Sequence, residues 1–524
     1  MSILTDDELA AEGWTAANGS LELARAELDQ LESRGVADRD YALKLLRRKF
    51  GGDGGKLRRR EEPAPCSRAI SADPENQIAT DNLASVERAM SQLLRVPNVE
   101  RGALMPDACP VGPAEAAIPV GGVVAVRDAI IPSATGSDIC CSVAATFFEA
   151  KDSDDSSAML DILMEVTRFG PGGRPENDLV PHPVTSEPVW SNPFLKGLER
   201  HAKIHMADQG DGNHFAFLGR FRLGEAEASL LTEAGHGEVV ERLKDRDFHV
   251  LVTHHGSRGL GAHVFKRGQN AALKHTKKVA RGIPDAAAWL DPNTPRGEAY
   301  WEALQYLARW TKANHQSIHN RFLDRLGAQA EWSTWNPHNF IWHRHGVYLH
   351  GKGATPAWRD DESENPLIGL VPLNMAQPIL LTLGADNPEH LGFSPHGAGR
   401  NQSRTGVLRD LRRKARRGGE SLEAALKRTT AGIDVRWYSG KPDITETPIG
   451  YKDPETIIAQ IAEFDLASVV GKIEPIGCIM AGKSKGRDDE EELTPKQIRQ
   501  MQHRADRRRG RQSLRDGDWD NDVE

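Results

Sequence analysis

Short apolar runs alternate with amphipathic stretches through most of the chain. Two stretches have the apolar spacing of helices that bury one face, Trp301–Phe322 and Ser421–Arg428. Four shorter runs are typical of strands: Val123–Val126, Val143–Phe148, Val250–Thr253 and Gly346–His350. Since no obvious linker divides residues 80–482, the pattern predicts one large α+β body.

The two ends of the chain differ from this body. Residues 1–65 predict a helical appendage, because Ser20 can cap a helix with Leu28 on its apolar face. A second amphipathic run, Tyr41–Phe50, leads into glycines and a Pro-containing linker that predicts a flexible joint. Residues 483–524 combine an acidic run with an arginine-rich run and have almost no apolar residues, which predicts a disordered tail or a lone exposed helix.

Composition narrows the class of protein. The 524 residues carry a net charge of −8, from 67 basic and 75 acidic side chains, and 39% are hydrophobic. A mean hydropathy of −0.52 and the lack of a long apolar run exclude an integral membrane protein. The N-terminus is acidic where a signal peptide is basic, so we expect a cytoplasmic protein without a membrane partner. Five cysteines are too few for a disulfide framework and are expected to be reduced thiols or ligands.

Histidine is the informative residue type. Of the 19 histidines, all except His503 lie between His182 and His396. Such clustering suggests a metal or phosphoryl-transfer site, although a His-rich stretch can also reflect surface composition. Five polar clusters contain the candidate residues: Asp138–Cys141, Asn213–His214, His254–Arg258, Asn336–Asn339 and His396–Arg404.

The residue types in these clusters suit metal and phosphate chemistry. A carboxylate three residues before a thiol, as in Asp138 and Cys141, can enter one metal shell if the turn is tight. Ser257 and Arg258 lie among glycines and could hold phosphate oxygens. Each cluster alone also fits a polar turn or a loop. Thiolate with imidazole suits zinc as readily as manganese.

The five clusters together resemble a known family. From about Met105 to Gly482 the sequence resembles the RtcB family of GTP-dependent RNA ligases, whose Gly-Asn-His-Phe, His-Gly-Ser-Arg-Gly-Leu-Gly and His-Gly-Ala-Gly-Arg motifs occur here in the family's order. The resemblance implies a single catalytic domain of mixed β-sheets flanked by helices, with a metal-lined central pocket. It implies two Mn²⁺ ions per site, held by Asp138, Cys141, His214, His254 and His338. The nucleotide and phosphate contacts are assigned to Asp107, Asn213, Ser257, Arg258, Lys352, Arg400 and Arg404.

The resemblance also implies a reaction. Family members join an RNA 3′-phosphate or 2′,3′-cyclic phosphate to a 5′-hydroxyl, and His396 falls on the histidine that GTP guanylylates. We therefore expect RNA with these ends as the partner, in RNA repair or tRNA splicing, and the resemblance allows for an activator protein. A basic run from Arg404 to Arg417 predicts a positive helix face suited to an RNA backbone, although a solvated face is the alternative.

Several positions depart from the family's pattern at its guanine-binding end. Met480 or Ala481 replaces a C-terminal lysine, Phe217 replaces a glutamate, and the loop at Leu373 lacks two glycines; elsewhere, His255 replaces a serine. The metal ligands are complete, so the sequence predicts a divergent paralogue that is an RNA ligase. Two alternatives stay open. One is a metal-dependent RNA phosphatase or cyclic phosphodiesterase without nucleotidylation, and the other is a non-catalytic RNA-binding repair accessory.

Overall fold

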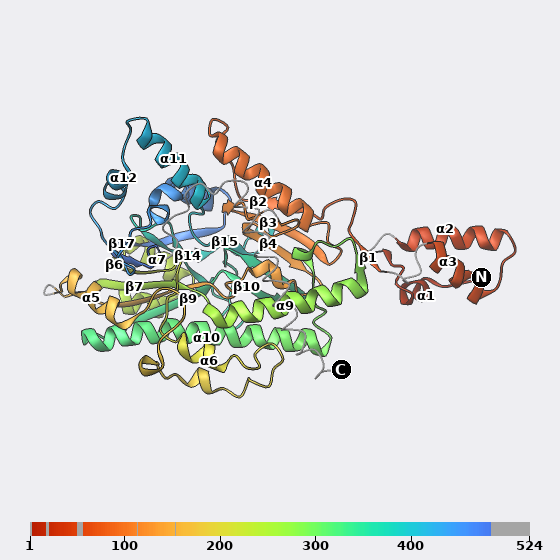
Figure 1. The fold of residues 1–524 in the computed structure, drawn as a ribbon, viewed down its shortest axis with the longest axis horizontal. Coiled ribbons are helices and arrows are strands. Elements are labelled where there is room, and N and C mark those ends of the chain that lie inside the picture. Colours follow the sequence, from red (N-terminus) through yellow and green to blue (C-terminus); the bar gives the residue numbers. More distant parts are fainter. Residues whose placement is uncertain (1–2, 17–19, 50–55, 113, 152–153, 484–524) are drawn as a thin grey trace.

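A computed structural model describes residues 3–16, 20–49, 56–112, 114–151 and 154–483. The predicted charged tail lies outside the described residues, apart from Lys483. In the described part the predicted α+β class is confirmed. Figure 1 shows a large body of sheets covered by helices and a smaller helical unit beside it. No described helix is long and apolar enough to cross a membrane.

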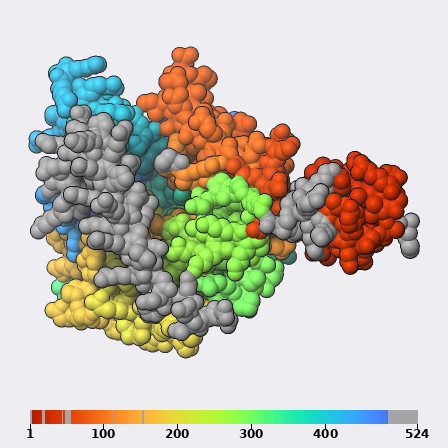
Figure 2. All heavy atoms as spheres, turned by 45° about the vertical axis from the view of Figure 1, so that its right-hand side comes forward, coloured from red at the N-terminus to blue at the C-terminus, as the bar shows by residue number. Residues whose placement is uncertain are grey.

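The N-terminal helical unit has a core of its own. It comprises α1 (Asp6–Ala11), α2 (Ser20–Ser33) and α3 (Arg39–Lys49). The apolar side chains at helical spacing, among them Leu9, Leu28 and Leu46, pack together around Trp14. Figure 2 shows this unit, in red, projecting from the body. The apolar faces of these helices are therefore buried against one another, as their spacing predicts.

The predicted linker already takes part in the body. Its residues Leu57 and Arg58 form β1 and pair in parallel with β8, Ala280–Arg281. The next strand, β2 (Cys66–Arg68), pairs with β3 (Val99–Cys109). The body thus begins before residue 80, and the assignment of residues 1–65 to a separate domain stays a prediction.

The larger sheet carries much of the candidate chemistry. Seven of its eight strands follow the spatial order β13-β14-β17-β6-β7-β5-β9, and β16 pairs beside β17. The bounds are β5 (Ser142–Glu149), β6 (Phe215–Arg222), β7 (Asp247–His255), β9 (Trp332–Pro337), β13 (Ile368–Pro372), β14 (Ile379–Gly384), β16 (Asp434–Trp437) and β17 (Ala467–Met480). Val250 and Phe217 lie in the apolar layer on one face. Leu251 and Leu218 lie in the layer on the other face, because successive side chains of a strand point to opposite sides.

The second sheet is smaller and lies beside the first. It has five strands in the order β10-β11-β4-β3-β2. Their remaining bounds are β4 (Val120–Val126), β10 (Asn339–Arg344) and β11 (Val347–Lys352), and a separate pair is formed by β12 (Ala354–Pro356) and β15 (Phe393–Pro395). One of its apolar faces packs under α4, Gln77–Leu93, through Val86 and Met90. The two sheets are continuous in the chain at the β9–β10 turn, where His338 lies.

Long helices cover the larger sheet. The longest, α10 (Pro295–Leu326), begins at a Thr294 cap and ends at Gly327, whose φ of 68° suits glycine. It packs against β5 and β7, and buries Trp310 and Phe322 completely. The other helices are α5 (Ser156–Val166), α6 (Glu199–Ile204), α7 (Glu225–Glu233), α8 (Gly237–Leu243), α9 (Arg258–Val279), α11 (Arg404–Arg416), α12 (Leu422–Thr429) and α13 (Pro454–Glu463).

Strand register determines which residues meet at one edge of the larger sheet. Ser142 at the start of β5 is opposite His255 on one side and Pro337 on the other. Cys141 directly precedes Ser142, and His338 directly follows Pro337. Three clusters that are far apart in the sequence therefore converge on one point.

Candidate active site

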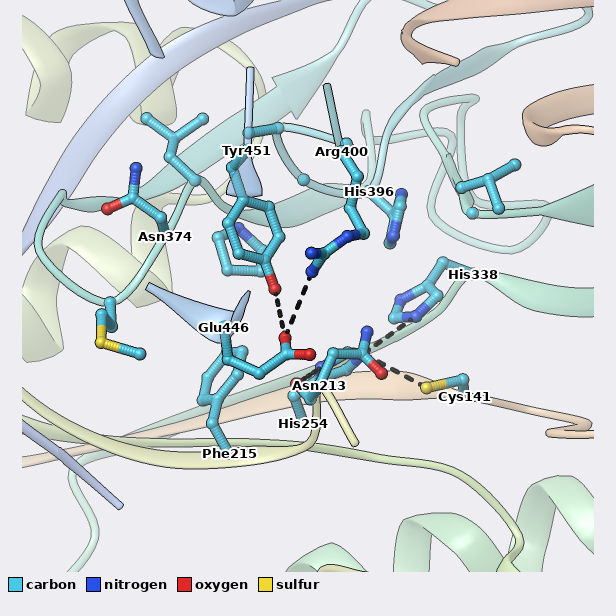
Figure 3. Close-up of a pocket in the computed structure, with 18 of the residues that line it drawn as sticks. Cys141, Asn213, Phe215, His254, His338, Asn374, His396, Arg400, Glu446 and Tyr451 are labelled. Atoms are coloured by element: carbon cyan, nitrogen blue, oxygen red, sulfur yellow. Dashed lines mark hydrogen bonds and ion pairs between the residues drawn. The ribbon is translucent and has the colours of Figure 1, made fainter. Parts of the chain in front are cut away.

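A cavity of about 430 Å³ lies between the two sheets. Figure 3 shows that residues from several segments surround it, with the thiol of Cys141 and the ring of His338 at one end and Asn374 at the other. The metal-type side chains occupy one end, and aromatic and thioether groups, including Phe217 and Met480, line the wall elsewhere. The cavity is therefore chemically asymmetric.

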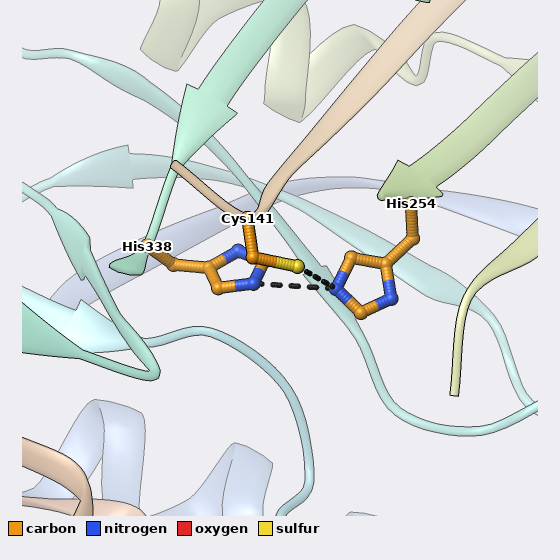
Figure 4. Close-up of side chains that lie close together, drawn as sticks. All are labelled: Cys141, His254 and His338. Atoms are coloured by element: carbon orange, nitrogen blue, oxygen red, sulfur yellow. Dashed lines mark hydrogen bonds between the residues drawn. The ribbon is translucent and has the colours of Figure 1, made fainter. Parts of the chain in front are cut away.

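The thiol of Cys141 is the shared member of two donor groups. Its Sγ atom lies 3.2 Å from Nε2 of His254 and 3.6 Å from Nε2 of His214. The Nε2 atoms of His254 and His338 are 3.2 Å apart, so these two rings and the thiol form the first group (Figure 4). The second group is Asp138, Cys141 and His214.

The second group depends on a tight approach of two loops. The carboxylate of Asp138 lies 2.8 Å from Nε2 of His214. Gly256 is in contact with the same carboxylate, and a Cβ at that position would collide with it. Only glycine therefore fits between the Asp138 carboxylate and the strand that carries His254.

Backbone carbonyls orient two of the imidazole rings. Nδ1 of His214 donates a hydrogen bond to the carbonyl oxygen of Gln209 at 2.8 Å. Nδ1 of His254 donates to the carbonyl oxygen of Asn213 at 3.2 Å. A neutral ring that donates from Nδ1 keeps the lone pair of Nε2 free, and in both rings this atom faces Cys141.

Burial keeps the imidazoles of His254 and His338 neutral and the Cys141 thiol protonated when no cation is bound. Desolvation, with the neighbouring His214 and His396, lowers the pKa of His254 to about 3. Desolvation and the nearby imidazoles of His396, His254 and His214 hold the pKa of His338 well below its ordinary value. Desolvation and the charge of Asp138 raise the pKa of the Cys141 thiol well above its ordinary value. A bound divalent cation would instead lower the pKa of the Cys141 thiol, because it favours the thiolate.

The carboxylate of Asp138 behaves differently. Burial would raise its pKa, but the attraction and hydrogen bond of His214, together with Arg258, hold the pKa below the ordinary value. One carboxylate, one thiol and three imidazoles form a donor set that fits divalent transition metals. These residues could therefore hold a metal at two positions that share the Cys141 sulfur.

His396 lies at the same end of the cavity and is held by Asp107. The Asp107 carboxylate accepts a short hydrogen bond from Nδ1 of His396 and accepts the His396 backbone N–H at 3.2 Å. Asp107 is fully buried, and its other oxygen has no partner among the described residues. The ring of His396 lies 4.7 Å from that of His338, centroid to centroid. With Nδ1 as the donor, Nε2 of His396 carries the lone pair that a nucleophile needs.

A cluster of basic and acidic side chains around Glu446 forms the middle of the cavity wall. Glu446 is buried and accepts a hydrogen bond from Nε of Arg404 at 2.5 Å and from the hydroxyl of Tyr451 at 2.8 Å. Arg400 lies 3.5 Å from the same carboxylate and donates to the carbonyl oxygen of Thr445 at 2.8 Å. Figure 3 shows Glu446, Tyr451 and Arg400 pointing toward one another. The carboxylate thus fixes two guanidinium groups at the cavity.

The structure brings most of the sequence-predicted residues together. Nine of them line the cavity: Asp138, Cys141, Asn213, His254, His338, Lys352, His396, Arg400 and Arg404. Asp107 lies just outside the wall, with its carboxylate behind His396. His214 joins through the second donor group. Burial lowers the pKa of Lys352, whose Nζ donates to the carbonyl oxygen of Ile118 at 3.4 Å.

Two predicted phosphate contacts lie elsewhere. The hydroxyl of Ser257 is buried and donates to the carbonyl oxygen of Ile139 at 2.5 Å, so it holds the loop before Cys141. Arg258 begins α9 and lies behind His214, with its NH1 atom 3.3 Å from Nδ1 of that ring. Neither residue lines the cavity. As the structure stands, their side chains support the metal-type donors.

Sequence reasoning missed Glu446 and Tyr451. Both line the cavity, and no motif marks them. Glu446 is far in the sequence from its nearest predicted partner, Arg404, and it occurs in an ordinary Thr-Glu-Thr-Pro segment. Only the folded chain shows that the basic run starting at Arg404 has a buried carboxylate beside it.

The fold and the donor cluster define an α+β protein with a candidate metal centre, and the comparisons with known proteins agree. A family model described as "tRNA-splicing ligase RtcB" matches residues 194–481, more than half of the chain. The chain therefore belongs to the RtcB family, as a divergent member.

Proteins of bacteria and archaea are among those similar to this chain. The RNA-splicing ligase RtcB of Mycobacterium tuberculosis is 24% identical over 69% of this chain and 93% of its own length. The RNA-splicing ligase RtcB of Escherichia coli K12 is 24% identical over 69% of this chain and 86% of its own length. The tRNA-splicing ligase RtcB of Archaeoglobus fulgidus is 25% identical over 51% of this chain and 58% of its own length.

The Tyr451 hydroxyl is expected to stabilise the cluster of basic and acidic side chains around Glu446. Tyr451→Phe removes the O–H donor to a buried carboxylate, so we expect it to lower the free energy of unfolding by about 2 kcal/mol. Urea denaturation measures the change. Tyr438→Phe, at a partly exposed ring, is the control and is expected to change the free energy by less than about 0.5 kcal/mol. Equal effects of the two changes would contradict the assigned role of Glu446.

Proposed function

We propose that this protein is an RNA ligase that joins an RNA 3′-phosphate or 2′,3′-cyclic phosphate to a 5′-hydroxyl through a histidine–GMP intermediate. One observation carries the proposal: a histidine oriented by a buried carboxylate lies beside a thiol, a carboxylate and three imidazoles suited to metals. The names of the relatives, RNA-splicing and tRNA-splicing ligases, support the same reaction. RNA repair and tRNA splicing are the settings that we propose for it.

The residues suggest how each step would proceed. Nε2 of His396 attacks the α-phosphorus of GTP, the new P–N bond forms, and pyrophosphate leaves with the electron pair of the broken P–O bond. The proton on Nδ1 stays in its hydrogen bond with Asp107, which stabilises the ring as positive charge develops. Water first opens a 2′,3′-cyclic phosphate by adding to phosphorus while the 2′-oxygen leaves as a hydroxyl, which gives the 3′-phosphate. An oxygen of this 3′-phosphate then attacks the guanylyl phosphorus, the P–N bond breaks, and His396 is regenerated. Attack by the 5′-hydroxyl on the activated 3′-phosphate releases GMP and forms the phosphodiester bond.

Other residues of the cavity would bind and neutralise phosphates. Two divalent cations held by Asp138, Cys141 and the three imidazoles, which we propose to be Mn²⁺, would supply charge neutralisation at the phosphate oxygens. Arg400 and Arg404 are fixed by Glu446 and present guanidinium groups to the cavity. Such fixed groups can bind phosphate with little loss of side-chain freedom.

The proposed setting is the cytoplasm, and RNA is the proposed partner. All five cysteines are free thiols in the structure, and the shared position of Cys141 requires a thiol that is not oxidised. A reducing compartment maintains that state. An activator protein remains a further proposal, based only on the family.

The covalent step gives the first prediction of this proposal. We expect Mn²⁺-loaded protein to become labelled by GTP carrying ³²P on the α-phosphate, and His396→Ala to lose the label. A denaturing gel measures the label, and His343→Ala, at an exposed histidine of β10, is the matched control that keeps it. ATP is tested beside GTP, because Phe217 and Met480 give the wall few hydrogen-bonding groups for a guanine edge.

The outcomes separate the candidate functions. A label from either nucleotide that depends on His396 supports nucleotidyl transfer, and the nucleotide that gives it identifies the cofactor. No label from either nucleotide would overturn the ligase proposal. Release of phosphate from a 3′-phosphate RNA, or opening of a 2′,3′-cyclic phosphate, would then identify the hydrolase alternative.

The shared thiol gives the second prediction. Cys141→Ala removes the sulfur common to both donor groups, so we expect it to lose both equivalents of bound Mn²⁺ and the ligase activity. Cys140→Ala changes the neighbouring buried thiol, which belongs to neither group, and is expected to keep both equivalents. Metal analysis after dialysis measures the stoichiometry. Two equivalents in Cys141→Ala would contradict a shared centre.

The third prediction concerns the exposed basic face of α11. This helix starts at Arg404 in the cavity wall, and its apolar side, Val407 and Leu411, is buried, while Arg409 and Arg413 are exposed. Changing Arg409, Arg413 and Arg416 to Gln is expected to raise the KM for RNA about tenfold or more, and to lessen its salt dependence, without changing labelling of His396. The matched control changes Lys274, Lys277 and Lys278 of α9, which are also exposed. Equal effects of both triple variants on KM would contradict an RNA site on α11.

A further inference from the structure

A chain of hydrogen bonds connects α10 to three strands behind the candidate metal centre. Thr146 Oγ1 lies 2.9 Å from Ser333 Oγ and 2.7 Å from Nδ1 of His319. Thr253 Oγ1 lies 2.7 Å from Nε2 of His319 and 2.6 Å from Nδ1 of His315. Nε2 of His315 lies 3.0 Å from the hydroxyl of Ser142. Five of the six members are buried, and Ser333 at one end is exposed.

Donor counting allows two directions for this row of hydrogen bonds, and the contact of the Ser142 hydroxyl with a carbonyl oxygen selects one of them. Each neutral imidazole has one N–H and one lone-pair nitrogen, and each hydroxyl has one proton to donate. Every contact is satisfied when the hydroxyl of Thr253 donates to Nδ1 of His315 and accepts from Nε2 of His319. The last hydroxyl, that of Ser142, then donates to the carbonyl oxygen of His255 at 3.4 Å. Aligned hydrogen bonds of this kind strengthen one another.

The surroundings keep both imidazoles in the neutral form that this direction needs. Burial lowers the pKa of His319 to about 3, and burial with the neighbouring His255 holds the pKa of His315 well below its ordinary value. The rings of His255 and His315 stack with centroids 3.5 Å apart. The amide of Asn314 lies 3.4 Å from both nitrogens of His255. Both stacked rings are therefore packed between α10 and β7.

Each of the three strands that these hydrogen bonds connect also presents a metal-type ligand. Ser142 begins β5 directly after Cys141, and Thr253 of β7 directly precedes His254. Ser333 belongs to β9, which ends directly before His338. Because side chains alternate along a strand, Thr253 faces α10 while His254 faces the cavity. The hydrogen-bonded chain thus ties together the three strands that bring one donor group to a point.

We propose that His315 and His319, bridged by Thr253, are positioning residues that set the spacing of Cys141, His254 and His338. This inference rests on the metal centre in the proposed function. Loss of the bridge leaves one nitrogen of each buried imidazole without its partner, Nδ1 of His315 and Nε2 of His319, and the strands can then shift by amounts that a metal shell does not tolerate. The effect is expected in metal affinity and ligand geometry, ahead of any effect on the overall fold.

The test compares isosteric changes at two buried threonines. Thr253→Val removes the bridging hydroxyl and keeps the shape, and Thr253→Ser retains the hydroxyl. Thr382→Val is the matched control, because Thr382 is equally buried on β14, a strand of the same sheet that carries none of these ligands. The probe is Co²⁺ alone, without nucleotide or RNA, and the readouts are its Kd and the thiolate-to-cobalt absorption band.

We expect Thr253→Val to weaken Co²⁺ binding about 10- to 100-fold and to shift the absorption band. Thr253→Ser is expected to restore both, and Thr382→Val to match the wild type, at similar melting temperatures for the two valine variants. Unchanged affinity and band in Thr253→Val would overturn the positioning role. If Thr253→Val does not fold, Ser142→Ala, which removes the partner of His315, gives the same comparison.

The same measurement separates this inference from the proposed function. A wild-type protein that binds Co²⁺ with a thiolate band, while Thr253→Val behaves identically, leaves the metal centre intact and overturns only the positioning role. A wild-type protein with no thiolate band overturns the metal centre itself, and the positioning role with it.

Discussion

The burial of one thiol group, that of Cys141, is the constraint on which the site depends. The thiol lies at the point where β5, β7 and β9 meet, within 3.2 Å of an imidazole nitrogen of His254. Burial raises its pKa, so without a cation it is a neutral group beside the neutral rings of His254 and His338. Burying several metal-type side chains together costs a large desolvation free energy unless a ligand binds them. The proposed cations account for a cluster that packing alone does not explain.

One sheet determines both the metal end and the apolar wall of the cavity. Phe215 of β6 is paired with His254 of β7 on one side and with Met480 of β17 on the other. Phe217, two residues further along β6, is paired with Cys478 of β17. The apolar wall is therefore one strand away from a metal-type ligand, and the strand spacing fixes the distance. Changes at Phe217 or Met480 can alter what the wall binds while the donor groups stay intact.

The two faces of β5, β7 and β9 carry side chains with different roles. On the cavity face they present the donor groups, and on the other face they present hydroxyls and apolar side chains to α10. The position of His255 illustrates this division, because it departs from the family pattern yet does not face the cavity. Its ring stacks on His315 of α10. A substitution in a motif can therefore reflect packing behind the site rather than chemistry inside it.

Local patterns predicted the elements and the candidate donors, and long-range contacts determined the rest. The strand at Val143–Phe148 and the helix at Trp301–Phe322 lie within β5 and α10, because their apolar spacing is a local property. Motifs likewise pointed to Cys141 and His396. No local signal marked Glu446, since its partner Arg404 is 42 residues away.

Two residues show that a motif does not determine which partner a side chain contacts. Ser257 was predicted to contact phosphate, but its hydroxyl holds the backbone of Ile139, a residue 118 positions away. The nucleotide contact of Asp107 stays a prediction, and in the structure its carboxylate accepts a hydrogen bond from His396. In both positions the residue type suited several roles. Only the fold decided which partner lay within hydrogen-bonding distance.

Anomalous X-ray diffraction from crystals of Mn²⁺-loaded protein would test the central claim most directly. We expect two anomalous peaks on either side of the Cys141 sulfur, one beside His254 and His338 and the other beside Asp138 and His214. A single peak away from Cys141, or no peak in this cavity from protein that binds Mn²⁺ in solution, would contradict a metal centre that shares this thiol.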